Sequence, residues 1–223
     1  MQVVLIRHAH SEANAKAILS GRLPNNNLSE KGKLQSEELS GRLGSFKINQ
    51  IRVSPMPRCS QTITPWLQTL PHKFQETLFI DENLNEVDYG SWSGKKLAIL
   101  SRNKLWATVQ NNPSAMYFPG GEGIAQMQTR AMSSIHEVVR SKNKGAIVIV
   151  SHGDVLKAIL ASALGMHLDN FQRLVIDPAS VSILDFANSI PKLLLINDTH
   201  SKLHGILKSK STIGNTLGGG SGR

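Results

Sequence analysis

The sequence of 223 residues has one cysteine, Cys59, few aromatic side chains and no long apolar segment. A single cysteine forms neither an intrachain disulfide nor a thiolate zinc site, so these two kinds of stabilised fold are excluded. No apolar run approaches the roughly 18 residues that a membrane-spanning helix needs. The apolar start of the chain is also too short for a signal peptide. These absences predict a cytoplasmic protein without a membrane partner.

Acidic side chains are scarce as well, because 16 Asp and Glu stand against 25 Lys and Arg, for a formal net charge of +9. Four of the basic residues follow residue 200, where no acidic residue occurs. A basic balance favours anionic partners, which include nucleic acids, acidic membrane surfaces and phosphorylated small molecules. Only 5% of residues are aromatic and no base-stacking or recognition-helix motif is present, so a nucleic-acid partner is disfavoured.

Apolar runs alternate with helical patterns along the chain. Buried strands are predicted at residues 3–6, 51–53, 78–80, 146–150, 181–186 and 193–196. Helices are predicted at residues 29–43, 57–70, 124–138 and 154–164, the first between an N-cap at Ser29 and a stop at Gly44. The alternation predicts a three-layer α/β fold with a mostly parallel β-sheet and helices on both faces. We expect one domain over residues 1–200 and a disordered basic, Gly-rich tail over 201–223.

Two histidines directly follow predicted strands. Arg7 and His8 come after residues 3–6, and His152 comes after residues 146–150. Ligands of open α/β sheets bind beyond the carboxyl ends of the strands. One histidine at such a place is more often structural, but two, with an arginine beside one of them, make a functional role equally plausible. Phosphate-loop alternatives fail on spacing, since Gly90 and Gly94 are separated by three residues and no Ser or Thr follows the lysine.

Four segments in order resemble the motifs of the histidine phosphatase superfamily, also called phosphoglycerate-mutase-like. Residues 7–14 read Arg-His-Ala-His-Ser-Glu-Ala-Asn, residues 54–62 contain Arg58, residues 84–94 contain Glu86, and residues 150–153 read Val-Ser-His-Gly. The Phe-Pro-Gly-Gly-Glu of residues 118–122 and the Asp-Pro-Ala-Ser-Val of residues 177–181 further resemble an actinobacterial subgroup of phosphatases or phosphomutases.

The resemblance implies five catalytic residues. His8 would attack phosphorus and form a phosphohistidine, with a backbone carbonyl fixing its tautomer. Arg7 and Arg58 would hold the phosphoryl oxygens with forked donors, and a protonated His152 would stabilise their charge. Glu86 would protonate the leaving oxygen, a role that needs a raised pKa; a water-poor pocket raises it, whereas nearby arginines lower it. These groups require no metal and no cofactor.

The same resemblance implies four further phosphate-binding residues. They are Asn14, Ser20, Gly21 and Gly153, which would join Arg7, Arg58 and His152. Asn and Gly are also common turn formers, so a purely structural role is the alternative for Asn14 and Gly21. The roles of one hydroxyl residue and one acidic residue stay open in the same way. Ser11 is equally suited to cap a short helix, and Glu122 either lines the leaving-group side or sits in the first turn of a helix.

The sequence therefore predicts a phosphomonoester phosphatase that acts on a small phosphorylated metabolite. The alternative is a bisphosphoglycerate-dependent phosphoglycerate mutase, which would use the same pocket. After Glu86 the chain reads Val-Asp-Tyr-Gly-Ser-Trp-Ser-Gly, without the Tyr-Gly-Leu-Asn-Lys-like stretch that such mutases usually carry. An inactive family member is disfavoured because all five catalytic residues are present. We expect a monomer or homodimer.

Overall fold

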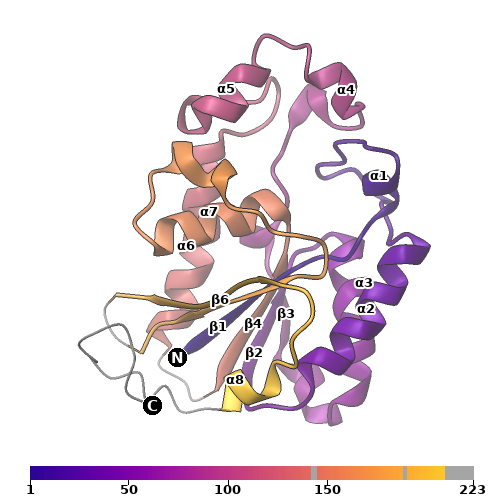
Figure 1. The fold of residues 1–223 in the computed structure, drawn as a ribbon, viewed down its shortest axis with the longest axis vertical. Helices are drawn as coiled ribbons and strands as arrows, with labels where there is room; N and C mark the ends of the chain where they lie inside the picture. The colour runs from indigo at the N-terminus through magenta and orange to yellow at the C-terminus, as the bar shows by residue number, and fades with distance from the viewer. Residues whose placement is uncertain (142–144, 188–189, 209–223) are drawn as a thin grey trace.

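In the computed structural model, which describes residues 1–141, 145–187 and 190–208, one β-sheet lies between two layers of helices (Figure 1). The strand order is β3-β2-β4-β1-β5-β6. The strands are β1 (Gln2–Arg7), β2 (Ile48–Val53), β3 (Leu78–Ile80), β4 (Ala146–Ser151), β5 (Val181–Asp185) and β6 (Lys192–Asp198). Pairing is parallel between β1 and β4, β2 and β4, and β2 and β3, and antiparallel where β5 joins β1 and β6. The predicted three-layer, mostly parallel α/β fold is confirmed.

The described residues form eight α-helices: α1 (Glu12–Ala15), α2 (Glu30–Leu43), α3 (Pro57–Thr69), α4 (Leu97–Leu100), α5 (Trp106–Asn111), α6 (Ile124–Arg140), α7 (Gly153–Ala163) and α8 (His204–Lys208). The four helices predicted from the sequence are α2, α3, α6 and α7, which begin and end close to the predicted positions. The Ser29 hydroxyl caps α2 by accepting from the Gly32 amide, and Gly44 ends it with a φ of 58°. Ser11 caps α1 in the same way, which resolves one of the alternatives left open.

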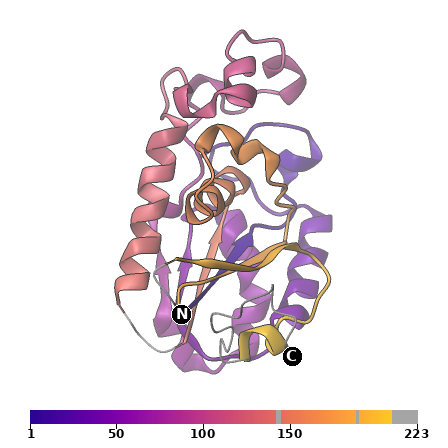
Figure 2. The same ribbon diagram turned by 60° about the vertical axis from the view of Figure 1, so that its left-hand side comes forward.

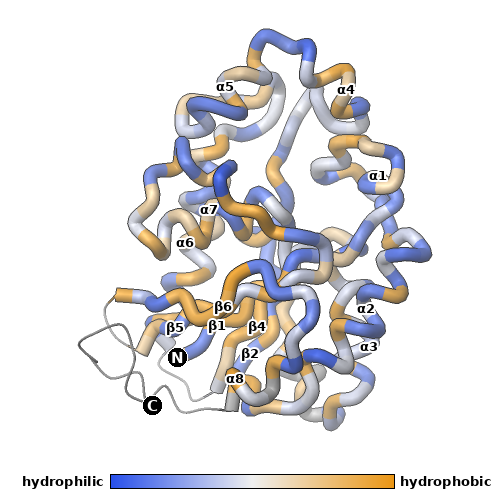
Figure 3. Tube along the Cα trace, in the orientation of Figure 1, coloured by the Kyte–Doolittle hydropathy of each residue, from blue (hydrophilic) through white to orange (hydrophobic). Residues whose placement is uncertain are grey.

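Alternate residues of the central strands pack into opposite layers. Val3 and Leu5 of β1 belong to the core beneath α6 and α7, whereas Val4 and Ile6 belong to the core beneath α2 and α3. All four are fully buried. The turned view of Figure 2 separates the two helical layers, and in Figure 3 the strands are predominantly apolar. Burial on both faces explains why these strands are continuous apolar runs.

The segments that surround the carboxyl ends of β1 and β4 are short and irregular. In Figure 1, α1, α4 and α5 lie beyond that end of the sheet. The chain after α1 is joined to the start of α4 by an isolated bridge between Ile18 and Lys96 and by a 3.0 Å hydrogen bond from the Leu19 amide to the Lys95 carbonyl. These contacts close one side of the space above the strand ends.

The segment expected to be a tail divides at residue 208. Leu203 is fully buried and Leu207 nearly so, and both belong to the core that α2 and α3 cover. Residues 201–208 thus pack as part of the domain because they carry apolar side chains at helical spacing. Residues 209–223, with the Gly-rich run, lie outside the described residues. Among the described helices, none has the length and apolar character to cross a membrane.

Candidate active site

His8 lies immediately after β1, where its imidazole is buried with 4% of its surface exposed. Its amide donates to the Ser151 carbonyl at 2.9 Å, which fastens it to the end of β4. Its Nδ1 lies 2.8 Å from the Ala9 carbonyl. A carbonyl only accepts, so Nδ1 carries the proton and Nε2 is left with its lone pair. Burial, followed by the charges of Arg58 and Arg7, holds the pKa of His8 well below its ordinary value. The ring is therefore a neutral nucleophile.

His152 follows β4 as the N-cap residue of α7 and is fully buried. Arg58 donates through Nη2 to His152 Nδ1 at 3.0 Å, and Ser54 Oγ lies 2.7 Å from Nε2. Burial and then the Arg58 charge lower the pKa of His152 well below its usual range. The free site thus differs from the expectation of a protonated His152. An imidazole that accepts from a guanidinium at one nitrogen carries its proton on the other, and so it is neutral.

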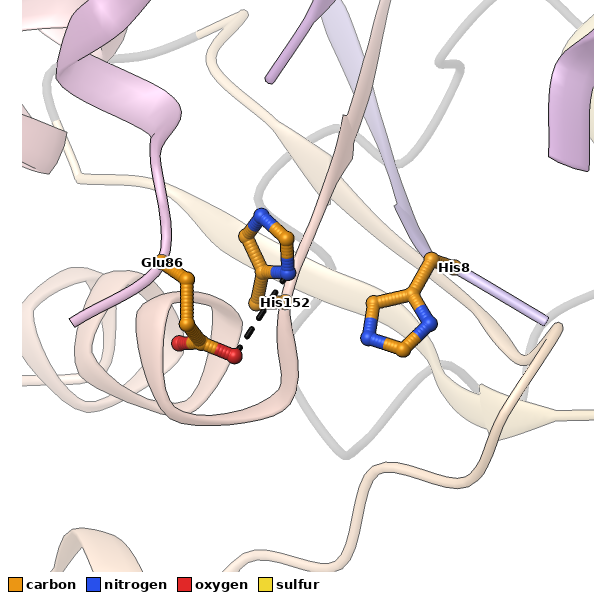
Figure 4. A group of neighbouring side chains, drawn as sticks. All are labelled: His8, Glu86 and His152. Atoms are coloured by element: carbon orange, nitrogen blue, oxygen red, sulfur yellow. Dashed lines mark ion pairs between the residues drawn. The ribbon is translucent and has the colours of Figure 1, made fainter. Parts of the chain in front are cut away.

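Glu86 comes from the loop between β3 and α4 and faces both histidines (Figure 4). Its Oε2 lies 3.5 Å from His152 Nδ1 and 3.8 Å from Arg58 Nη2, and its Oε1 accepts from the Val87 amide at 2.9 Å. Burial raises the pKa of Glu86 to about 7, against the Arg58 charge, which lowers it. Of the two opposing effects weighed from the sequence, desolvation is the larger. At neutral pH the carboxyl group can therefore both give and take a proton.

Three buried guanidinium nitrogens at this site have no hydrogen-bond partner. They are Nε of Arg7 and both Nε and Nη1 of Arg58. Other donors of these side chains are used, since Arg7 Nη1 donates to the Ile176 carbonyl at 2.6 Å and Arg58 Nη2 to the Gly21 carbonyl at 3.0 Å. A buried charged donor without a partner is costly. Two arginines that converge with donors to spare indicate a site for an oxyanion.

A cavity of about 210 Å³ opens onto these groups. Seven of the nine predicted site residues line it: Arg7, His8, Asn14, Ser20, Gly21, Glu86 and Gly153. Arg58 and His152 are fully buried and contact Glu86 from behind. The structure thus brings together residues that lie up to 146 positions apart along the chain, from Arg7 at the end of β1 to Gly153 after β4.

Neighbouring atoms leave little room for a Cβ at Gly21 or Gly153. Gly21 has a φ of +52°, and a Cβ there would meet the Ser93 hydroxyl at 2.8 Å. A Cβ at Gly153 would lie 3.3 Å from Arg7 Nε, in the space next to that unpaired donor. Asn14 accepts from the Ser11 amide at 3.0 Å through Oδ1, so its amide nitrogen is the donor that it can offer a ligand.

His8, Glu86 and His152 have ligand atoms within 4.8 Å of one another, the one such group among the described residues. This spacing is compatible with a metal ion, but the surrounding charge is not. Arg58 already donates to the His152 nitrogen that faces Glu86, and Arg7 lines the same cavity. Two guanidinium groups repel a cation and attract an anion, so the donor set favours an oxyanion over a metal.

Several residues of the site escaped sequence analysis. Tyr89, Asp154 and Lys157 line the cavity, and the Tyr89 hydroxyl donates to Asp154 at 3.0 Å. Asp154 directly follows the motif of His152 and Gly153, a position that could have marked it. Arg22 and Arg130 donate to the Glu86 carbonyl, and both bind Glu122, which does not line the cavity.

Comparisons with known proteins agree with this arrangement. Residues 3–199 match the histidine phosphatase superfamily (branch 1). Phosphoserine phosphatase 1 of Hydrogenobacter thermophilus is 28% identical over 204 residues, which cover 89% of this chain and 93% of that protein. The 2,3-bisphosphoglycerate-dependent phosphoglycerate mutase of Thermoplasma acidophilum is 27% identical over 82% of this chain and 86% of its own.

A solved structure has the same fold. The α-ribazole phosphatase of Shigella flexneri superposes with a TM-score of 0.77 and is 25% identical, covering 90% of this chain and 98% of that one. The family match spans the sheet except for Gln2 and includes every residue of the cavity. The chain therefore belongs to the histidine phosphatase superfamily.

Proposed function

We propose that this protein, a phosphomonoester phosphatase of its superfamily, transfers the phosphoryl group of a small phosphorylated metabolite first to His8 and then to water. The observation that carries the proposal is the pairing of an unprotonated His8 Nε2 with unused guanidinium donors of Arg7 and Arg58. A nucleophile beside unpaired guanidinium donors suits attack on a phosphoryl group, because the donors neutralise the charge on the three equatorial oxygens.

In the first step, the lone pair of His8 Nε2 forms a bond to phosphorus while the bond from phosphorus to the leaving oxygen breaks. The Glu86 carboxyl group gives its proton to that oxygen, which departs as an alcohol. In the second step, the Glu86 carboxylate removes a proton from water as its oxygen attacks phosphorus. The N–P bond breaks, its electron pair returns to His8, and inorganic phosphate is released.

His152 takes part through its charge state. In the free site the pKa of His152 is lowered, first by burial and next by Arg58. A phosphoryl dianion that binds the two arginines offsets their positive charge, which raises the tendency of His152 to take up a proton. His152 would then donate to a phosphoryl oxygen as charge develops there. Asn14, Ser20, Gly21 and Gly153 would complete the phosphate-binding wall.

The cavity bears on the substrate class. At about 210 Å³ it fits a phosphate and a small leaving group, with apolar contacts from Ile18, Leu19 and Leu97 on one side. Phosphoglycerate mutation is the second candidate, because one relative carries that name and the chemistry differs only in the acceptor. We further predict that the protein is cytoplasmic, that it is a monomer or homodimer, and that it has no nucleic-acid partner.

The experiment that tests the function is replacement of the nucleophile. His8→Ala should lower hydrolysis of p-nitrophenyl phosphate by about three orders of magnitude or more, because the variant lacks the imidazole nitrogen that attacks phosphorus. A phosphoenzyme trapped by acid quench should appear in the wild type and be absent in the variant. Full activity in a folded His8→Ala protein would contradict covalent catalysis. EDTA should leave the wild-type rate unchanged, since no step uses a metal.

A further assay separates the two candidate reactions. Phosphate release from phosphorylated metabolites without added 2,3-bisphosphoglycerate supports the phosphatase. Interconversion of phosphoglycerate isomers that depends on this additive, with little phosphate release, would instead identify a mutase.

A further inference from the structure

The acid residue Glu86 sits on a backbone that no regular element holds. Residues 85–89 belong to neither helix nor strand, so they have no ladder of backbone hydrogen bonds. Proton transfer needs the carboxyl group within hydrogen-bond reach of the leaving oxygen. Because a displacement of about 1 Å costs on the order of 10²-fold in rate, something must fix this segment.

Two arginines from distant parts of the chain hold the Glu86 carbonyl oxygen. Arg22 donates to it through Nε at 2.8 Å, and Arg130 of α6 donates through Nη2 at 3.1 Å. Arg130 also donates through Nη1 to the carbonyls of Asn83 and Asn85, at 2.8 and 2.7 Å. One guanidinium thus fixes three carbonyls of the segment that leads into Glu86.

Both arginines are themselves held by the carboxylate of Glu122. Its Oε1 accepts from Arg22 Nη2 at 2.8 Å and from Arg130 Nη2 at 2.7 Å, while Oε2 accepts from Arg130 Nε at 3.0 Å. The Asp88 amide also donates to Oε1 at 2.9 Å, and the Glu122 amide donates to the Asp88 carbonyl at the same distance. Glu122 therefore grips the chain on the other side of Glu86.

The same group connects the acid to the phosphate-binding wall. Arg22 directly follows Gly21, whose carbonyl accepts from Arg58. A shift of Arg22 would thus move Gly21 and the Glu86 carbonyl together. The Glu122 and Arg130 side chains are largely shielded, with 16% and 17% exposed, and charge-assisted bonds are stronger where water is partly excluded. None of Arg22, Glu122 and Arg130 lines the cavity.

We propose that Arg22, Glu122 and Arg130 form a positioning clamp that holds Glu86 at proton-transfer distance from the leaving oxygen. The clamp touches the backbone of Glu86 and no substrate, so its residues act through Glu86. The proposal rests on the proposed function, in which Glu86 is the general acid. It assigns Glu122 to neither of the roles expected from the sequence, the leaving-group wall or the first turn of α6.

The test uses the full chain and a series of aryl and alkyl phosphates whose leaving groups differ in pKa. Glu122→Gln removes the charge that holds both arginines. We expect kcat/KM to fall by about 10- to 100-fold for poor leaving groups and by less than about threefold for good ones, because only poor leaving groups need the proton. The loss should lie in kcat, with KM little changed. Arg22→Met removes one donor from an exposed edge of the clamp and should give the same pattern more weakly.

Glu137→Gln is the control, because it makes the same chemical change at another glutamate that pairs with an arginine. Glu137 forms a bidentate pair with Arg52, at 2.6 and 3.0 Å, and neither residue lines the cavity. This variant should show no dependence on the leaving group. When Glu86→Gln is already present, adding Glu122→Gln should not increase the dependence of kcat/KM on the leaving group, because the clamp acts through Glu86.

The outcomes separate the clamp from the mechanism beneath it. Suppose that Glu86→Gln lowers kcat/KM more for poor leaving groups than for good ones. The clamp is then contradicted if both Glu122→Gln and Arg22→Met lower kcat/KM equally for all leaving groups, or do not lower it at all. If Glu86→Gln lowers kcat/KM equally for good and poor leaving groups, Glu86 is not the general acid, and the clamp proposal is wrong as well. Should Glu122→Gln not fold, Arg22→Met decides, since Arg22 is 35% exposed and its loss leaves the Arg130–Glu122 pair intact.

Discussion

Glu86 shows how one buried carboxyl group serves two opposite steps. Burial raises its pKa, Arg58 lowers it, and Asp154 raises it again, so that the value comes to about 7. A carboxyl group with an ordinary pKa would be ionised at neutral pH and could not protonate a leaving oxygen. One with a much higher pKa could not accept a proton from water. The position between Arg58 and Asp154 balances these needs.

The pH dependence of the first step follows from that pKa. Glu86 must be protonated to act as the acid, so kcat/KM for a poor leaving group should decline above pH 7. We divide kcat/KM for the poor leaving group by kcat/KM for a good one, so that the effect of ionisation of the substrate phosphate cancels. In Glu86→Gln the ratio should be independent of pH and lower by about 10²- to 10⁴-fold. A ratio in the wild type that stays constant from pH 5 to pH 9 would contradict the assignment.

The catalytic residues were predictable from the sequence through two signals, their place after a buried strand and their resemblance to family motifs. Arg7, His8 and His152 stand directly after apolar runs, and Arg58 and Glu86 were supplied by resemblance to family motifs. Arg22 and Arg130 carry no such signal, because their function arises from contacts across the fold. Arg22 and its partner Glu122 are 100 positions apart, and no local pattern links them.

At the scale of elements, the first turn of α2 supports the loop after His8. Gly32 packs against the His10 carbonyl so closely that a Cβ would collide with that oxygen. The same carbonyl accepts from the Ser29 amide at 3.0 Å and from the Ser29 hydroxyl at 3.1 Å. The N-terminus of α2 thus fixes the chain two residues beyond the nucleophile.

Two glycines of α2 offer a matched pair of substitutions. Gly32→Ala should lower the free energy of unfolding by about 1–3 kcal/mol, because backbone must move to admit the methyl group. Gly41→Ala should raise it by up to about 1 kcal/mol, since a Cβ there meets nothing within 4 Å and alanine favours the helix. Urea unfolding measures both. We also expect phosphatase activity to fall in Gly32→Ala and not in Gly41→Ala. Equal changes in the free energy of unfolding for the two substitutions would contradict the close packing of α2 against the loop after His8.

The long helices and strands were predictable, whereas the short helices α4 and α5 were not. The apolar face of α6 and the buried apolar runs of β1 and β4 are patterns that extend over many residues of the sequence. By contrast, α4 has four residues and α5 has six, too few to show a helical period. Their positions depend on contacts such as the stacking of Trp92 on Trp106, with ring centroids 6.3 Å apart.

At the scale of the whole molecule, the excess of basic residues gains a specific meaning. Arg7 and Arg58 place two positive charges at one buried site, where three of their nitrogens lack partners. Burying these charged groups is costly, and an oxyanion bound in the cavity would offset that cost. Ligand binding and stability of the whole chain are therefore coupled.

Inorganic phosphate should stabilise the protein against heat. At 100 times its dissociation constant a ligand adds about 2.7 kcal/mol, which for a chain of this size raises Tm by about 5–10 °C. Arg58→Met removes two of the unused donors and should abolish most of the shift. Arg52→Met removes another buried arginine, which binds Asp81 and Glu137, so it should lower Tm yet leave the phosphate shift intact.

Differential scanning fluorimetry with and without phosphate, against chloride at equal ionic strength, measures this shift. Chloride controls for general screening, which acts on exposed charges over the whole surface. A shift of equal size in chloride, or one that survives Arg58→Met unchanged, would show that anions act elsewhere on this basic protein. A shift that only Arg58→Met removes would support Arg58, which contacts both His152 and Glu86, as the principal anion-binding group of the molecule.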